Sequence, residues 1–240
     1  MKEETLYLKC KKEDIGESIL LTGSPERVAR IAELMDEAQT IAQNREFITV
    51  TGRYQGERLT AVSSGIGSSS AAIAVEELVQ LGAKRIVRVG TTMGVSAPLG
   101  AYVLSTGAAR FEGTSRYYLD PAYPAVPDWS LSQRILGSGR RHGLEIRLGI
   151  TATYDAFYPS MAAGLMGHEA LNKEELETAQ VTAVDMETGL LYIMGIRLRF
   201  AAVSFCLVTN SFAPFAALDA AVRSAGEEKL IKTVLEGLVS

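Results

Sequence analysis

The chain has 240 residues, of which 47% are hydrophobic and 22% charged, and its formal net charge is −4. Such a slightly acidic chain lacks the excess of cations that nucleic acid or an anionic membrane attracts, so we expect neither as a partner. It contains no run of about 18 apolar residues and no signal-peptide core, which predicts a cytoplasmic protein. Cys10 and Cys206 show no metal or redox spacing, in keeping with a reducing compartment. The hydrophobic share supports a sizeable core, and the length suits one domain over residues 1–240.

The first predicted strand, residues 19–22, runs directly into a helix that starts at Pro25. Proline suits the first helical position, and apolar residues then recur at positions 28, 31, 32 and 35. Gly23 therefore lies in a strand-to-helix turn, whose unpaired N–H groups attract anions. Arg27 lies in the first helical turn, where a cation opposes the helix dipole unless it has a task. Together these features indicate an anion site.

A second candidate anion site follows the apolar run that begins at residue 85. The β-branched residues at positions 86, 87 and 89 predict a buried strand that ends in a turn at Gly90. Arg88 lies inside this run, where a cation is costly unless it meets an anion. Thr91 and Thr92 then offer hydroxyl and backbone N–H groups for an oxyanion. The alternative is an arginine paired with a core carboxylate before an ordinary turn, and this stretch alone slightly favours that alternative.

The rest of the chain alternates between predicted strands and helices. Further strands are expected at residues 48–50, 58–63, 102–105, 147–150 and 200–208, the first two as a hairpin around residues 54–57. Further helices are expected after the glycine-rich residues 64–70 and at residues 130–142, 190–193 and 219–239. This alternation predicts an α/β fold on a largely parallel sheet.

Two further stretches carry groups suited to a ligand. Residues 151–159 leave a predicted strand end with three aromatic side chains, a composition that suits a ring-shaped ligand or a packed loop equally well. Asp185 and Glu187 flank Met186 at the start of a predicted helix. Acidic residues in a first turn are usually only partners of the helix dipole, so that alternative stays open here.

Seven segments together resemble the nucleoside phosphorylase superfamily, specifically its uridine phosphorylase branch. They follow in family order over nearly the whole chain, at residues 23–28, 44–47, 64–67, 74–78, 88–92, 155–159 and 185–187. This collinearity is far more specific than any single motif. The resemblance implies a three-layer αβα fold with a central mixed sheet, assembled as dimers that build a hexamer.

The resemblance also implies roles for individual residues. The phosphate ligands would be Gly23, Arg27, Arg88, Thr91 and, lent by a neighbouring subunit, Arg45. The nucleoside would meet Tyr7 of the neighbour and Thr92, Phe157, Met161, Asp185, Met186 and Glu187. Arg27, Arg88 and Glu187 would carry the catalysis. Some family members hold a monovalent cation between subunits, and the matching residues here are Glu46, Ile66 and Ser70, so K⁺ is a candidate ligand.

The implied reaction is phosphorolysis, with inorganic phosphate as co-substrate and no cofactor. Phosphate attacks C1′ of the sugar while the base leaves, through a transition state with oxocarbenium character. The products would be the free base and ribose 1-phosphate, so the enzyme would be a pentosyltransferase of nucleoside catabolism and pyrimidine salvage. The related hydrolytic nucleosidases lack the three arginines, which argues against hydrolysis. A non-catalytic nucleoside or phosphate binder would have no need of three converging cations.

The base-binding residues depart from the uridine phosphorylase pattern. Met161 and Ala163 stand where that branch places a glutamine and an arginine on the uracil edge, and Met93 replaces a glycine. Thr209 and Asn210 stand where purine-specific relatives place a catalytic aspartate and uridine-specific ones an arginine. We therefore expect weak cleavage of uridine and a preference for a more apolar or differently shaped base. A purine-type phosphorylase is the alternative within the family.

Overall fold

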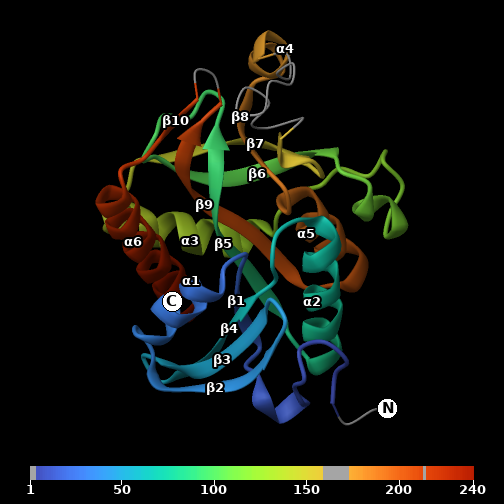
Figure 1. Ribbon diagram of the computed structural model, residues 1–240, viewed down its shortest axis with the longest axis vertical. Coiled ribbons are helices and arrows are strands. Elements are labelled where there is room, and N and C mark those ends of the chain that lie inside the picture. The colour runs from blue at the N-terminus through green and yellow to red at the C-terminus, as the bar shows by residue number, and fades with distance from the viewer. Residues whose placement is uncertain (1–3, 159–172, 213–214) are drawn as a thin grey trace.

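The computed structural model describes residues 4–158, 173–212 and 215–240, which form one sheet with helices on both faces (Figure 1). The strands are β1 Ser18–Thr22, β2 Asp36–Asn44, β3 Phe47–Tyr54, β4 Glu57–Ser63, β5 Arg85–Gly94, β6 Tyr102–Phe111, β7 Ile146–Tyr154, β8 Val181–Asp185, β9 Ala201–Ser211 and β10 Ala216–Ala217. The α-helices are α1 Pro25–Ala32, α2 Ser68–Leu81, α3 Trp129–Arg141, α4 Lys173–Thr178, α5 Thr188–Leu198 and α6 Ala220–Val239. Short 3₁₀ helices span Lys12–Asp14 and Thr114–Tyr117.

The sheet runs in the order β10-β9-β6-β7-β8-β5-β1-β4-β3-β2, and β5 also pairs with β9. Among the described residues, β1 pairs in parallel with β4 and β5, β5 with β9, and β7 with β6 and β8. The other five pairings are antiparallel, so the expectation of a largely parallel sheet was wrong. The three-layer αβα fold with a central mixed sheet is confirmed.

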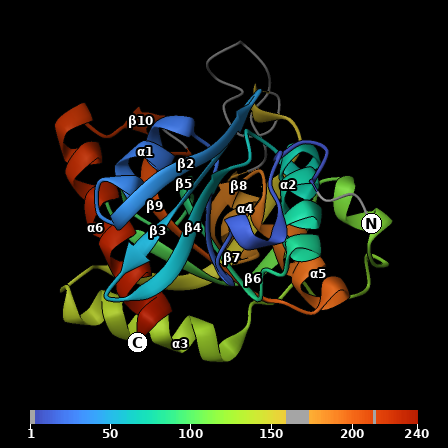
Figure 2. The same cartoon turned by 90° about the horizontal axis from the view of Figure 1, so that it is seen from below.

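Alternate side chains of strand β1 pack into two different hydrophobic clusters, one on each face of the sheet. In β1, Ile19 and Leu21 pack with α2 and α5, whereas Leu20 packs with α1, α3 and α6. Figure 2 shows the two helix groups on opposite sides of the sheet. This period of two is what a strand buried on both faces requires.

The turn between β3 and β4 was predicted from its residues. Gln55 and Gly56 both have positive φ, 51° and 87°, as a two-residue hairpin of type I′ requires. By contrast, β2 and β8 were not predicted. Strand β2 is an exposed edge strand without apolar alternation, and β8 is a five-residue strand buried throughout. Strand β5 also continues past the predicted turn at Gly90, so Thr91 and Thr92 belong to the strand.

Within the described residues, no helix is both long and apolar enough to cross a membrane.

Candidate active site

A pocket of about 710 Å³ lies at the carboxyl ends of β1 and β5. These strands are parallel neighbours, so the turn after β1 and the end of β5 meet at the edge where α/β sheets bind ligands. The residues predicted for the site that line this pocket are Gly23, Arg27, Ile66, Arg88, Thr91, Thr92, Phe157, Asp185, Met186 and Glu187. Segments far apart in sequence are thus brought to one place.

Arg88 and Glu187 form an ion pair at the floor of the pocket. Arg88 Nη2 contacts Glu187 Oε2 and lies 3.4 Å from Asp185 Oδ2, while Nη1 contacts Cys206 Sγ. Burial alone would lower the pKa of Arg88, but Cys206, Glu187 and Asp185 raise it overall, so the guanidinium stays charged. Arg88 is therefore paired with buried carboxylates, which was the alternative to an anion site in the sequence-based interpretation. It also lines the pocket.

Glu187 joins the two sides of the pocket. It occupies the N-cap position of α5, but its side chain does not cap that helix. Instead Oε1 accepts a hydrogen bond of 2.6 Å from the backbone N–H of Gly67, at the start of α2. Gly67 has φ of 90°, a conformation that glycine adopts without strain. The glycine-rich turn therefore fixes the carboxylate of Glu187. If Glu187 were only a partner of the helix dipole, its carboxylate would not need this hydrogen bond.

Asp185 lines the pocket, and its carboxylate accepts hydrogen bonds from residues around it. Its Oδ1 accepts from Thr153 Oγ1 at 2.9 Å, and its Oδ2 accepts from both the backbone N–H and the hydroxyl of Thr188. Its side chain is almost fully buried. Thr92 is similarly engaged, because its hydroxyl donates to the carbonyl of Val184 at 2.7 Å. Both residues line the pocket, yet their polar atoms are already used to hold β5, β7 and β8 in place.

Arg27 belongs to a cluster of charges between α1 and α6. Its Nη1 donates to Thr22 Oγ1 and its Nη2 to Glu227 Oε1, both at 2.9 Å. Glu227 also pairs with Arg30 at 2.6 Å and with Arg223 at 3.0 Å. Burial would raise the pKa of Glu227, but Arg27 and Arg223 lower it overall. One buried carboxylate thus pairs with three arginines, of which Arg27 and Arg223 line the pocket.

Glu227 and Arg223 were not predicted as site residues from the sequence. Arg223 lines the pocket, and it lies one helical turn before Glu227 in α6. The available signal was a glutamate on the buried face of an amphipathic helix, among Leu230, Ile231 and Val234. A carboxylate is seldom buried unless it is paired.

The pocket also has apolar and aromatic lining residues. Phe157 and Tyr158 meet edge to face at 5.2 Å between ring centroids, and both line the pocket. Met93 is buried and also lines the pocket. Asn210 is a further lining residue, and its side-chain oxygen accepts from Thr209 Oγ1 at 3.0 Å. Met161 and Ala163 lie outside the described residues. Tyr158 was not predicted as a lining residue.

Residues 17–236 match the family model of the phosphorylase superfamily. The chain belongs to this superfamily. It is similar to the uridine phosphorylase of Thermococcus kodakarensis, with 35% identity over 94% of this chain and 86% of that protein. It is also 36% identical to the guanosine phosphorylase of Halorubrum lacusprofundi, over 85% of this chain and 83% of that protein.

A solved structure supports the same membership of the phosphorylase superfamily. The uridine phosphorylase of Vibrio fischeri ES114 superposes with a TM-score of 0.88 and 28% identity, covering 99% of this chain and 98% of that chain. The uridine phosphorylase of Escherichia coli is 31% identical over 80% of each protein. Since relatives named for uridine and for guanosine are about equally similar to this chain, overall identity does not decide the base.

Two of the residues that the superfamily resemblance assigns to the site lie elsewhere on the protein. Arg45 is exposed in the turn between β2 and β3, and its guanidinium lies 5.9 Å from the ring centroid of Tyr7. Neither residue lines the pocket. Asn44 and Glu77 hold Tyr7 in place, because Asn44 Nδ2 donates to the Tyr7 carbonyl and Glu77 accepts from its N–H. The N-terminal segment and the hairpin turn thus form one surface feature.

The predicted cation-binding residues are partly brought together. Ser70 Oγ lies 3.0 Å from Glu46 Oε1 and 2.6 Å from the Ser64 carbonyl oxygen, and its one proton can be donated to either acceptor. The side chain of Ile66 is exposed at the pocket. The oxygen ligands on offer are the Glu46 carboxylate, the Ser70 hydroxyl and the Ser64 carbonyl. They carry one negative charge in total, which suits a monovalent cation. In the part of the chain that the structure describes, no group of three or more His, Cys, Asp or Glu residues could hold a metal.

Proposed function

We propose that this protein is a nucleoside phosphorylase, a pentosyltransferase that cleaves a uridine-like nucleoside with inorganic phosphate and needs no cofactor. The proposal rests mainly on the contact between Arg88 and Glu187. It places a buried cation directly beside a carboxylate in the pocket. A phosphate bound at Arg88 and a ribose bound at Glu187 would be direct neighbours. This is the arrangement that attack of phosphate on C1′ needs.

The phosphate would bind among Arg27, Arg88, Thr91 and the backbone of Gly23. The two guanidinium groups offer forked donors that match phosphate oxygens, and the turn after β1 adds N–H groups. The protonated state of Arg88 is secured by its carboxylate neighbours. A fixed cationic seat holds phosphate in line with the sugar and favours it over water as the nucleophile.

Glu187 would accept hydrogen bonds from the ribose hydroxyl groups, beside the backbone of Met186. During the reaction one phosphate oxygen bonds to C1′ as the bond from C1′ to the base nitrogen breaks. The electron pair of the broken bond leaves with the base, which then takes up a proton. The sugar carries positive charge in this transition state, and the fixed carboxylate of Glu187 stabilises that charge. Phe157 and Tyr158 offer ring faces and edges to the base.

The complete site would be shared between two copies of the chain. Arg45 and Tyr7 are joined to each other and lie apart from their own pocket, so they are available to a neighbour. In an isologous dimer each copy would then lend Arg45 to the phosphate and Tyr7 to the sugar of the other. We infer that such dimers build a hexamer in the cytoplasm for pyrimidine salvage, and that K⁺ can bind near Glu46, Ser70 and Ile66.

A purine nucleoside is the second candidate substrate. It is favoured by the similarity to a guanosine phosphorylase and by Asn210, whose amide can both donate and accept hydrogen bonds at a purine edge. The proposal is tested by incubating the protein with pyrimidine and purine nucleosides, each with and without phosphate, and measuring free base and ribose 1-phosphate. Base release that needs phosphate and yields ribose 1-phosphate supports a phosphorylase, and the substrate with the highest kcat/KM assigns the base. Absence of base release from every nucleoside contradicts it.

A further inference from the structure

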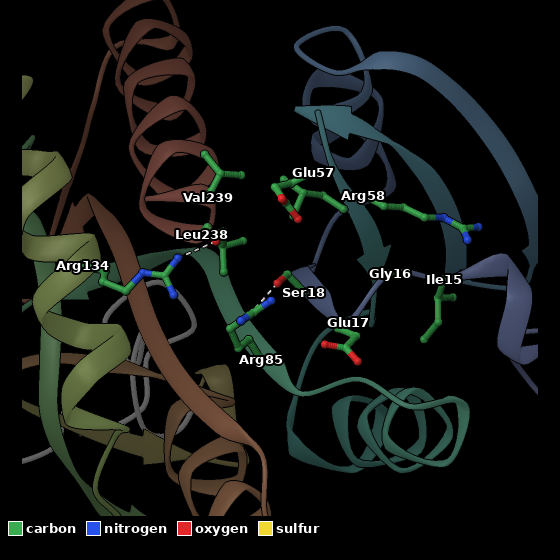
Figure 3. Close-up of a pocket in the computed structure, with 11 residues that line it drawn as sticks. Ile15, Gly16, Glu17, Ser18, Glu57, Arg58, Arg85, Arg134, Leu238 and Val239 are labelled. Carbon is green, nitrogen blue, oxygen red and sulfur yellow. Dashed lines mark hydrogen bonds between the residues drawn. The ribbon is translucent and has the colours of Figure 1, made fainter. Parts of the chain in front are cut away.

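A second pocket, of about 540 Å³, lies at the amino ends of β1 and β5 (Figure 3). The proposed active site uses the opposite, carboxyl ends of the same two strands. The two pockets have no lining residue in common. The second pocket is therefore a site separate from the proposed active site.

Two arginines from different elements reach into this second pocket. Arg85 is the first residue of β5, and its Nε donates to Ser18 Oγ at 2.7 Å. Arg134 comes from α3, and its Nη2 donates to the carbonyl of Leu238 at 2.6 Å. Figure 3 shows both guanidinium groups in the space between the end of α6 and the start of β1. Each is held by one neutral oxygen, which fixes its position without neutralising its charge.

Among the described residues, no carboxylate is ion-paired with either arginine, although Glu17 and Glu57 also line the pocket. In the same part of the chain, Nε of Arg134 is buried without a hydrogen-bond partner. Burial and the nearby charge of Arg85 lower the pKa of Arg134. Two cations that repel each other and a buried unpaired donor both cost free energy, which a bound anion would recover.

The remaining lining residues restrict the kind of anion. Glu17 and Glu57 have exposed side chains at the pocket and, among the described residues, form no ion pair with Arg85 or Arg134. Their carboxylates can accept hydrogen bonds from hydroxyl groups. Arg58 also lines the pocket, but its guanidinium donates to the carbonyl of Glu13 and points away in Figure 3. The pocket thus combines two cations with acceptors for hydroxyl groups.

We infer that this pocket binds a sugar phosphate, a phosphate monoester on a hydroxyl-bearing body of pentose or hexose size. The two guanidinium groups match the two negative charges of a phosphate monoester, and arginine forks suit its oxygens. Glu17 and Glu57 accept from the sugar hydroxyls. The volume lies within the range of about 300–1,000 Å³ that small-molecule sites occupy.

The test is calorimetric titration of ribose 5-phosphate and of ribose. It uses full-length protein that carries Arg88→Ala, so that the proposed active site contributes as little as possible. We expect one ribose 5-phosphate per chain and at least tenfold weaker binding of ribose. Adding Arg85→Gln or Arg134→Gln should weaken binding of ribose 5-phosphate by at least tenfold. Adding Arg140→Gln should change nothing, because Arg140 is an exposed arginine of the same helix α3.

Thermal unfolding shows whether each variant is folded, and Arg134→Lys replaces Arg134→Gln if the latter is not. Lysine keeps the charge but not the fork, so we expect it to weaken binding as well. The inference is wrong if the Arg88→Ala protein does not bind ribose 5-phosphate. It is also wrong if ribose binds equally well, or if the changes at Arg85 and Arg134 leave the affinity as it was.

Discussion

Arg88 and Glu187 contact each other across the floor of the pocket, although 98 residues separate them in the sequence and they lie on β5 and at the start of α5. In the free protein Arg88 pairs with both Glu187 and Asp185. A phosphate would give Arg88 a further anion to bind, and a ribose would give Glu187 hydroxyl donors. The pair therefore couples the two proposed binding steps. Phosphate replaces part of the interaction that Arg88 has with Glu187, and the ribose hydroxyls replace part of the interaction that Glu187 has with Arg88.

Replacing Arg88 with alanine should abolish most activity and leave the fold intact. We expect kcat/KM for phosphorolysis to fall on the order of a hundredfold or more, as when one ligand of a transition-state anion is removed. Arg88→Lys should restore only part of the loss, because lysine cannot contact Glu187 and phosphate with one planar fork. Circular dichroism and thermal unfolding provide the control for folding. A folded Arg88→Ala protein with full phosphorolysis would place the site elsewhere.

Glu227→Gln should raise KM for phosphate more than KM for the nucleoside. The carboxylate fixes Arg27, so its loss should loosen one phosphate ligand and leave the ribose and base contacts unchanged. We expect KM for phosphate to increase roughly tenfold, the lower end of the effect seen when a residue that orients a ligand-binding side chain is lost. Glu228→Gln is the matched control, because Glu228 is the next residue of α6 and pairs with exposed Lys232. Equal effects on both KM values would show that Glu227 has only a structural role.

The same residue should also shape the stability of the protein in acid. The pKa of Glu227 is lowered from its ordinary value of 4.5 by Arg27 and Arg223, which outweigh burial. Its contribution to stability is therefore present above the ordinary pKa and is lost as pH falls through the lowered value. Thermal unfolding between pH 7 and pH 3 should show that Glu227→Gln loses less stability over this range than the parent protein. Parallel curves for the two proteins would contradict the role of Glu227 as a charged partner.

Mixing two inactive variants should restore activity if the sites are shared. In a mixed dimer of Arg45→Ala and Arg88→Ala chains, one site would carry both changes and the other neither. Random pairing of equal amounts would leave about a quarter of all sites intact. Activity after mixing should approach that fraction, whereas each variant alone stays inactive. Absence of recovery after subunit exchange has been demonstrated by mass spectrometry would mean that Arg45 does not serve a neighbour.

Uridine should be cleaved weakly compared with a nucleoside of a more apolar or larger base. Apolar contacts such as those of Met93 and Phe157 discriminate by only ~1–3 kcal/mol per methylene-sized change, whereas a buried hydrogen bond can discriminate more strongly. Tyr154, a nearby tyrosine whose hydroxyl could in principle have replaced the lost hydrogen-bonding side chains, stacks on Phe111 at 4.8 Å and does not line the pocket. Steady-state kinetics with uridine, thymidine, inosine, adenosine and guanosine decides the base. An efficient uridine reaction would show that Asn210 or another residue replaces the altered contacts.

The phosphate side of the pocket could be predicted from the sequence because its signals are local. Gly23 and Arg27 follow a strand within one turn, and Arg88 lies in a buried apolar run. The partners of these residues could not be predicted in the same way. Glu227 meets Arg27 from 200 residues away, and only the packing of α6 against α1 brings them together. Edge strand β2 was missed because its side chains do not alternate between apolar and polar.

In the proposed reaction phosphate, and not water, attacks the sugar. This step is tested most directly by running the reaction with inorganic phosphate labelled with ¹⁸O and analysing the sugar product by ³¹P NMR and mass spectrometry. We predict ribose 1-phosphate in which the oxygen that bridges C1′ and phosphorus is ¹⁸O from phosphate. Release of free ribose that carries an oxygen from the solvent, at a rate independent of phosphate, would contradict attack by phosphate.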